Sequence, residues 1–154
     1  MIMTFVYLIQ HGKSLPKEVD PERKLSDEGI AETARIAKFL KSAGVKIDKI
    51  IHSDKLRAKM TAEIIAKELG ISNISEEPGL APLDDPTPWA NKLNEVEDNV
   101  MIVGHLPHLS KLTSMLLNIP TEVVSFRYSG VLCLEKLESG VWRIKWYVTP
   151  DIIK

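Results

Sequence analysis

Short apolar runs alternate along the chain with longer segments in which the apolar residues recur at helical spacing. The short runs are rich in β-branched residues, which is typical of strands. They cover residues 3–9, 47–51, 100–103, 131–137 and 141–148. The last two flank Glu138-Ser139-Gly140, which predicts a β-hairpin. A weak strand at 71–74 and a brief extended piece at 123–126 are also expected.

The segments with helical spacing lie between the strands. The first follows Ser26, a suitable N-cap, carries Asp27 and Glu28 in its first turn, and ends at Gly44. Its apolar positions are Ile30, Ala34, Ala37 and Leu40, with Ile36 and Phe39 beside them. The second runs over 54–69, with Leu56, Met60, Ile64 and Ile65 on its expected buried side. Further helices are predicted over 89–96 and from Pro107 to about Leu117.

The order of these elements predicts an α/β protein. The pattern β-α-β-α-β-α-β-α-β-β indicates a three-layer α/β/α sandwich with a mostly parallel sheet and an antiparallel edge strand. Proline-containing loops are expected over 10–26 and 76–88. No internal repeat is present, and one domain over 1–154 is expected. Trp142 and Trp146 are predicted to share one face of the last strand.

The composition narrows the class of partner. Of the 154 residues 44% are apolar and 27% charged, and the formal net charge is -1, so bulk charge favours neither nucleic acid nor an anionic membrane. No apolar run reaches the roughly 20 residues that span a bilayer. The single cysteine, Cys133, forms no internal disulfide, and no basic segment precedes the first strand. A cytoplasmic protein is expected.

Three predicted strands end in histidine, at His11, His52 and His105. In an open parallel sheet such ends lie at one edge, where ligands bind. Hydrogen-bond donors and cationic side chains lie near these strand ends in the sequence, and such a group suits a phosphate-like anion. These donors and cations are Lys13, Ser14, Ser53, Arg57 and His108. A neutral histidine facing a phosphoryl group can act as its nucleophile, and a second histidine can stabilise the transferring oxygens. His52 is expected at the surface or facing a loop.

Four segments, in order, resemble the motifs of the histidine phosphatase (phosphoglycerate-mutase-like) superfamily. Gln10-His11-Gly12 is similar to its Arg-His-Gly signature, and Leu25-Ser26-Asp27-Glu28-Gly29 to its Leu-Thr-x-x-Gly segment. Residues 53–62 resemble Ser-x-x-x-Arg-Ala-x-x-Thr-Ala, and Gly104-His105 the second-histidine motif. The likeness covers nearly the whole chain and, in length and motif order, is best to the small SixA-type phosphohistidine phosphatases.

This resemblance implies a phosphoglycerate-mutase-like fold, a hydrolase that needs no metal, and a role for each matching residue. His11 would be the nucleophile that becomes phosphorylated, Arg57 would bind the phosphoryl group, and His105 would be the second histidine of the pocket. Arg23 matches an arginine that small members place near the pocket. The implied substrate is phosphohistidine on a protein or a small phosphomonoester.

The sequence departs from the family at Gln10, where the signature has arginine. Glutamine donates hydrogen bonds but carries no positive charge. The loss of one charge-assisted contact to the phosphate costs about 2–4 kcal/mol of transition-state stabilisation. Lys13 or Arg23 would supply part of the charge. The sequence therefore leaves two interpretations, an active phosphatase with a rearranged pocket and a weakened member that binds a phosphorylated ligand or protein. Asp84 and Asp85 are candidates for the proton donor.

Overall fold

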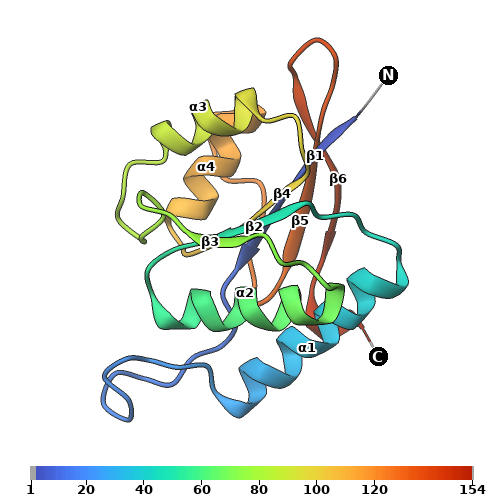
Figure 1. Cartoon of the computed structure of the whole chain (residues 1–154). Coiled ribbons are helices and arrows are strands. Elements are labelled where there is room, and N and C mark those ends of the chain that lie inside the picture. The colour runs from blue at the N-terminus through green and yellow to red at the C-terminus, as the bar shows by residue number, and fades with distance from the viewer. Residues whose placement is uncertain (1–2, 154) are drawn as a thin grey trace.

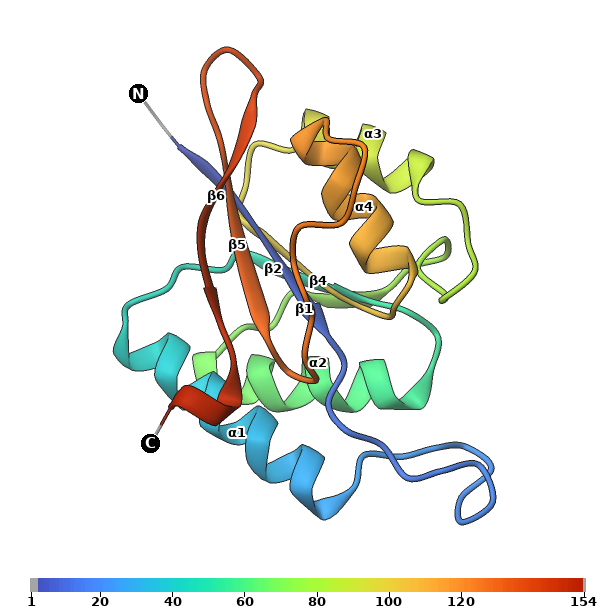
Figure 2. The ribbon, with the colours of Figure 1, turned by 180° about the vertical axis from the view of Figure 1, so that it is seen from behind.

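The computed structural model of the protein describes residues 3–153, so Met1, Ile2 and Lys154 of the expected domain lie outside it. Six strands form one sheet with helices on both faces (Figures 1 and 2). The elements are β1 (Thr4–Gln10), α1 (Asp27–Ser42), β2 (Lys49–His52), α2 (Leu56–Leu69), β3 (Ile74–Glu76), α3 (Thr87–Glu95), β4 (Val100–Gly104), α4 (His108–Leu117), β5 (Val131–Lys136), β6 (Trp142–Val148) and a 3₁₀ turn (Pro150–Ile152). No helix within 3–153 has the length and apolar character needed to cross a membrane.

The sheet is mostly parallel, as predicted. The strand order is β3-β2-β4-β1-β5-β6; the first four strands pair in parallel, whereas β5 runs antiparallel to β1, and β6 to β5. Helices α1 and α2 cover one face and α3 and α4 the other (Figure 1). Alternate residues of β1 serve the two cores: Val6 and Leu8 face α3 and α4, whereas Tyr7 and Ile9 face α1 and α2. The predicted three-layer sandwich is confirmed.

Helix α1 begins and ends as its caps predict. The Ser26 hydroxyl accepts a hydrogen bond from the Gly29 amide, and Gly44, with φ of 73°, follows the last turn. The predicted buried face was only partly right, because Ile30 is 40% exposed and Phe39 36% exposed. The buried face of α1 consists of Gly29, Thr33, Ile36, Ala37 and Leu40.

Helix α2 packs on a face of mostly small residues, which differs from the predicted face. Of the residues expected there, only Ile65 is fully buried, whereas Leu56, Met60 and Ile64 are half-buried. Ala58, Thr61, Ala62 and Ala66 form the rest of the contact face. Small side chains allow α2 to approach the sheet and α1 closely, so the larger apolar residues lie at the border of that contact.

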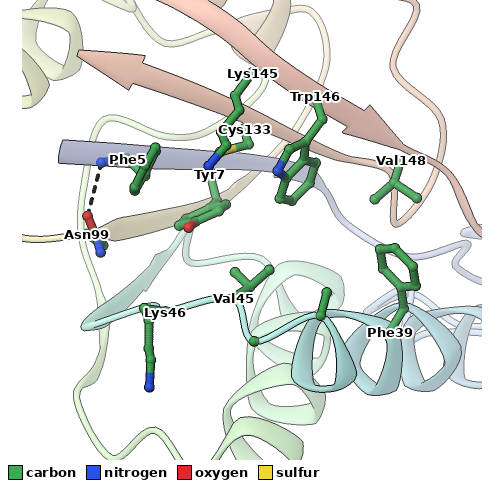
Figure 3. Close-up of a pocket in the computed structure, with 12 residues that line it drawn as sticks. Phe5, Tyr7, Phe39, Val45, Lys46, Asn99, Cys133, Lys145, Trp146 and Val148 are labelled. Carbon is green, nitrogen blue, oxygen red and sulfur yellow. Dashed lines mark hydrogen bonds between the residues drawn. The ribbon is translucent and has the colours of Figure 1, made fainter. Parts of the chain in front are cut away.

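The edge of the sheet contains an irregularity that the sequence did not reveal. In β6, Trp146 pairs with Cys133 and Ile144 with Leu134, which leaves Lys145 as an extra residue in a β-bulge. The prediction that Trp142 and Trp146 share a face was therefore wrong. Trp142 packs in the core beneath α3 and α4, whereas Lys145 and Trp146 are directed toward Phe5 and Tyr7 on the opposite face (Figure 3).

Two weaker predictions also need correction. The strand expected at 71–74 starts only at Ile74 and runs to Glu76, where it pairs with β2. The piece expected at 123–126 forms no strand; the chain there is irregular until Tyr128 bridges to Gln10. Both segments are short, so pairing with a neighbouring strand, rather than local propensity, decides their boundaries.

Candidate active site

The register between β1 and β4 brings two of the histidines together. Gln10 lies opposite Gly104, so the next residues along the two parallel strands, His11 and His105, are neighbours. The His11 amide donates a 3.0 Å hydrogen bond to the Gly104 carbonyl, and the two imidazole centroids are 4.9 Å apart. Both rings are largely enclosed, with His11 6% and His105 1% exposed. The predicted meeting of two strand ends is present.

The hydrogen bonds of His11 indicate which ring nitrogen is free. Nδ1 lies 2.7 Å from the Gly12 carbonyl oxygen, which can only accept, so Nδ1 carries the proton. Nε2 therefore bears the lone pair, and Arg57 Nε donates to it from 3.3 Å. This tautomer directs the lone pair of the ring at the group that would hold an anion.

Burial keeps both histidines neutral. Loss of solvation lowers the pKa of His11 to about 4, and the hydrogen bond to Gly12 opposes this shift only in part. Burial also lowers the pKa of His105 to about 3, with the charges of His11 and Arg57 acting in the same direction. At neutral pH the pair therefore offers one imidazole with a free lone pair on Nε2 and a second imidazole that is also uncharged.

Stability should consequently fall with acidity. In the unfolded chain a histidine titrates near its ordinary pKa of about 6.5, so between there and pH 4 the unfolded state binds more protons than the native state. The free energy of unfolding should drop by about 1.4 kcal/mol per pH unit for each such histidine. Urea unfolding at pH 7, 6 and 5 measures this slope. His11→Gln should reduce the slope by the contribution of one histidine, about 1.4 kcal/mol per pH unit. An unchanged slope would contradict the lowered pKa of His11.

Arg57 is positioned by the first turns of α2. The Thr61 hydroxyl donates to the Arg57 carbonyl at 2.8 Å and accepts from the Gly12 amide at 2.9 Å. One side chain thus joins the helix that carries Arg57 to the loop that carries His11. Arg57 is half-buried, and loss of solvation and the neighbouring charge of Arg23 lower its pKa.

Arg23 reaches the same region from the loop between β1 and α1. Its side chain donates to Ser14 Oγ at 3.0 Å and to the Leu15 carbonyl at 3.3 Å, from a backbone with φ of 54°. Its charge helps to lower the pKa of both His11 and Arg57. The charges of two guanidinium groups therefore act on the neutral His11, an arrangement that suits an anion with several oxygens.

Two further side chains lie against the histidines: Ser53, which was expected among the donors near the strand ends, and Tyr128, which was not predicted. Ser53 Oγ lies 2.6 Å from His105 Nε2, and both residues are buried. Ser53 opens the motif that contains Arg57, so the motif held a signal for it. The Tyr128 ring lies 5.6 Å from the His11 ring, and no pattern in the sequence indicated it.

Gln10 is buried where the resemblance expects an arginine. It is 8% exposed, and its Oε1 has no hydrogen-bond partner among residues 3–153. The alternation of β1 places it on the α3 and α4 face, after Val6 and Leu8. An amide can turn its NH₂ group toward an anion, but it adds no charge.

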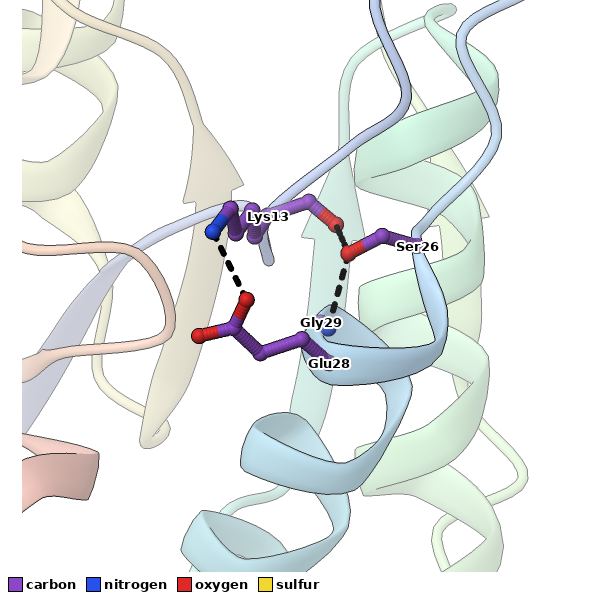
Figure 4. Close-up of polar contacts among 4 residues, drawn as sticks. All are labelled: Lys13, Ser26, Glu28 and Gly29. Carbon is purple, nitrogen blue, oxygen red and sulfur yellow. Dashed lines mark hydrogen bonds and ion pairs between the residues drawn. The ribbon is translucent and has the colours of Figure 1, made fainter.

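Lys13 does not supply the missing charge in this structure. Its ammonium forms a 2.7 Å ion pair with Glu28 at the exposed start of α1 (Figure 4). The backbone of Lys13 also contacts the start of α1: its carbonyl accepts hydrogen bonds from the amide and the hydroxyl of Ser26. A Cβ at Gly29 would lie 2.0 Å from the Lys13 carbonyl oxygen, so only glycine allows this approach. The contact braces the loop that follows His11.

Three of the other candidates, Asp84, Asp85 and His52, have local partners. Asp84 accepts from the Ala81 amide and Asp85 from the Thr87 amide, so each carboxylate caps a turn of its own loop. Of the two places expected for His52, the surface was wrong, since the residue is buried; its Nδ1 hydrogen-bonds the Ser53 carbonyl in the loop after β2. His108 is fully buried in α4. Across residues 3–153, no three or more histidine, cysteine or acidic side chains gather to hold a metal ion.

Comparison with known proteins agrees with this geometry. The profile of the histidine phosphatase superfamily (branch 1) matches residues 6–84. The chain is 28% identical to the phosphohistidine phosphatase SixA of Escherichia coli strain K12, over 97% of this chain and 96% of that protein. It is 32% identical to an uncharacterized protein of Picosynechococcus, over 96% of this chain and 92% of the relative.

Among solved structures, the protein histidine phosphatase SixA complexed with tungstate superposes with a TM-score of 0.86 at 27% identity, covering 96% of this chain and 97% of that one. This likeness confirms the phosphoglycerate-mutase-like fold expected from the motifs. Together with the profile match, it shows that the chain belongs to branch 1 of the histidine phosphatase superfamily and is of the SixA type.

Proposed function

We propose that the protein hydrolyses phosphohistidine on a protein, or a small phosphomonoester, through a phosphorylated His11. The observation that carries the proposal is the neutral His11 ring, whose unprotonated Nε2 faces Arg57 beside His105. A buried nucleophile with a free lone pair next to fixed donors is the arrangement that phosphoryl transfer requires.

The reaction takes two steps. His11 Nε2 attacks phosphorus and forms a P–N bond while the bond from phosphorus to the leaving nitrogen or oxygen breaks. Arg57 and Arg23 neutralise the phosphoryl oxygens, and His105 lies beside them as a hydrogen-bonding partner. Water then attacks phosphorus and loses a proton to solvent, the P–N bond breaks with its electron pair returning to His11 Nε2, and inorganic phosphate leaves. With a phosphohistidine substrate the leaving imidazole takes its proton from solvent and departs readily once protonated, so for this substrate neither Asp84 nor Asp85 is needed as a strong acid.

The surface beside the site supports a protein substrate. A groove of about 580 Å³ contains both Arg23 and Arg57. Its other charged residues are Lys17, Glu22, Asp54, Lys55, Lys59 and Glu76. A side chain carried on a folded protein could enter such a groove together with the residues around it. The name of the Escherichia coli relative, a phosphohistidine phosphatase, favours the same class of substrate.

The proposal is tested by phosphate release. The purified chain should liberate inorganic phosphate from a histidine-phosphorylated phosphocarrier protein and, more slowly, from p-nitrophenyl phosphate. Rapid quenching should trap a phosphoryl group that is stable to alkali and labile to acid, located on the His11 peptide by mass spectrometry. Turnover of neither substrate, or a label at another residue, would overturn the mechanism.

The second interpretation, a phospholigand-binding module, is favoured by the uncharged Gln10 and by the pairing of Lys13 with Glu28. Gln10→Arg separates the two interpretations. For an enzyme adapted to glutamine, kcat/KM for the phosphohistidine protein should stay the same or fall, because the buried amide site is shaped for a neutral side chain. A gain of about a hundredfold or more from almost no activity would instead favour the binding module. Gln10→Glu, which adds no cation, is the matched control.

A further inference from the structure

A second cavity lies away from the histidines. It has a volume of about 390 Å³ and is situated between the end of α1 and the strands β1, β5 and β6 (Figure 3). Its floor includes Phe5 and Tyr7 in the first half of β1. Phe5 precedes His11 by six residues of extended chain, or about 20 Å. The cavity is therefore separate from the candidate active site, and its volume is in the range of small-molecule sites.

Four aromatic rings contribute to its walls. Phe5, Tyr7, Phe39 and Trp146 line it together with Val45 and Val148. The centroids of Tyr7 and Trp146 are 6.0 Å apart and their planes are inclined by 44°, so the two rings form a tilted aromatic pair in the wall. The β-bulge at Lys145 is what turns Trp146 onto this face of the sheet. A flat apolar group fits such walls by stacking.

The charged side chains that line the cavity are both cationic. Lys145 Nζ lies 4.4 Å from the centroid of the Phe5 ring and bends over the cavity, whereas the Lys46 ammonium points outward (Figure 3). Neither lysine forms an ion pair with another residue of 3–153. Two carboxylates whose charges act on lining residues are otherwise engaged, since Asp48 accepts from the Asn99 backbone amide and Glu135 pairs with Arg143.

Neutral hydrogen-bond donors complete the lining. Asn99 Oδ1 accepts from the Phe5 amide at 3.0 Å, which leaves the NH₂ group of Asn99 to donate. Burial raises the pKa of the Tyr7 hydroxyl and of the Cys133 thiol, so both stay protonated at neutral pH. The cavity thus combines aromatic walls, one overhanging ammonium and uncharged donors, with no carboxylate among its lining residues.

We propose that this cavity binds a small organic anion with a flat aromatic body, whose carboxylate or sulfonate lies against Lys145 while its rings contact Phe5 and Trp146. The charge of Lys145 selects an anion, and the aromatic walls select a flat ring system. Phosphate alone lacks the apolar part and is not expected to bind here. The site is independent of the proposed phosphatase activity.

Two probes of similar shape test the proposal. The intact protein is titrated with 1-anilinonaphthalene-8-sulfonate and with the uncharged N-phenyl-1-naphthylamine, monitored by probe fluorescence. The sulfonate should bind with one-to-one stoichiometry and several times more tightly at low salt, and 20 mM inorganic phosphate should not displace it. Equal affinity for the two probes, or displacement by phosphate, would contradict the proposal.

Substitutions locate the bound probe. Lys145→Gln should weaken sulfonate binding by about three- to tenfold and leave the neutral probe unaffected. Lys92→Gln is the matched control, because Lys92 also lies 4.4 Å from an aromatic centroid, that of Trp89, on the other face of the sheet. Ala43→Trp, at an exposed position on the rim, should block both probes while the melting temperature stays within a few degrees. Unchanged binding in both Lys145→Gln and Ala43→Trp would overturn the assignment.

Discussion

Replacing His11 with alanine should abolish phosphatase activity, with a loss in kcat/KM on the order of 10⁴-fold or more. The substitution removes Nε2, the unprotonated ring nitrogen to which Arg57 donates. The remaining pocket could still bind the phosphoryl group through its arginines, but no covalent intermediate would form. Steady-state phosphate release from the phosphohistidine protein, and acid-labile labelling of the enzyme, should both disappear.

A second histidine variant controls for a general effect on the fold. His52 is buried at the end of β2, and its Nδ1 bonds the Ser53 carbonyl. His52→Asn retains a donor for that carbonyl, so most of the activity should remain. Binding of tungstate, measured by calorimetry, should persist in His11→Ala at reduced affinity. Activity in His11→Ala equal to that of the wild type would eliminate the proposed covalent mechanism.

The second large effect is expected at Arg57. Arg57→Gln should lower kcat/KM by about 10²–10³-fold, in the range found when one donor to a transition-state oxyanion is removed. The cost should be near the upper end, because Gln10 already replaces one charge that the family places in this pocket. Loss of the charge should affect kcat as well as KM, since negative charge on the phosphoryl oxygens is redistributed during transfer.

Two further variants distinguish the direct contact of Arg57 with the site from the general positive charge of the groove. Lys59 follows Arg57 on α2 and lines the same groove, so Lys59→Gln removes one positive charge without touching His11. That variant should lose less than about threefold, because exposed charges contribute little in high dielectric. Arg57→Lys should recover part of the loss, as lysine keeps the charge but not the planar donor geometry. Equal losses in Arg57→Gln and Lys59→Gln would contradict a direct role.

Several local features followed from the sequence because they depend on neighbouring residues. The apolar runs that end in His11 and His105 are strands, the Ser26 cap starts α1, and Gly44 ends it. The hairpin formed by β5 and β6 also follows from local pattern. Each depends on side-chain periodicity or backbone preference within a few residues, which a single sequence carries in full.

Other features depend on which segments meet in space. The small-residue face of α2 reflects close packing against α1 and the sheet, and the bulge at Lys145 reflects pairing with β5. The bulge places Trp142 and Trp146 on opposite faces, where a shared face was expected, and brings Trp146 to the wall of the second cavity. A single extra residue in a strand changes every later side chain from one face to the other, and nothing in the local pattern reports it.

For the candidate site, local patterns were enough to indicate the candidate residues: two histidines at strand ends, an arginine in the matching motif, and an uncharged residue at Gln10. Their geometry depends on how distant segments pack. The register of β1 on β4 places His11 beside His105, the fold of the first loop brings Arg23 near and pairs Lys13 with Glu28, and the Gly12 carbonyl selects the tautomer of His11. These contacts join segments far apart in the chain, so their distances and hydrogen bonds exist only once the sheet has formed.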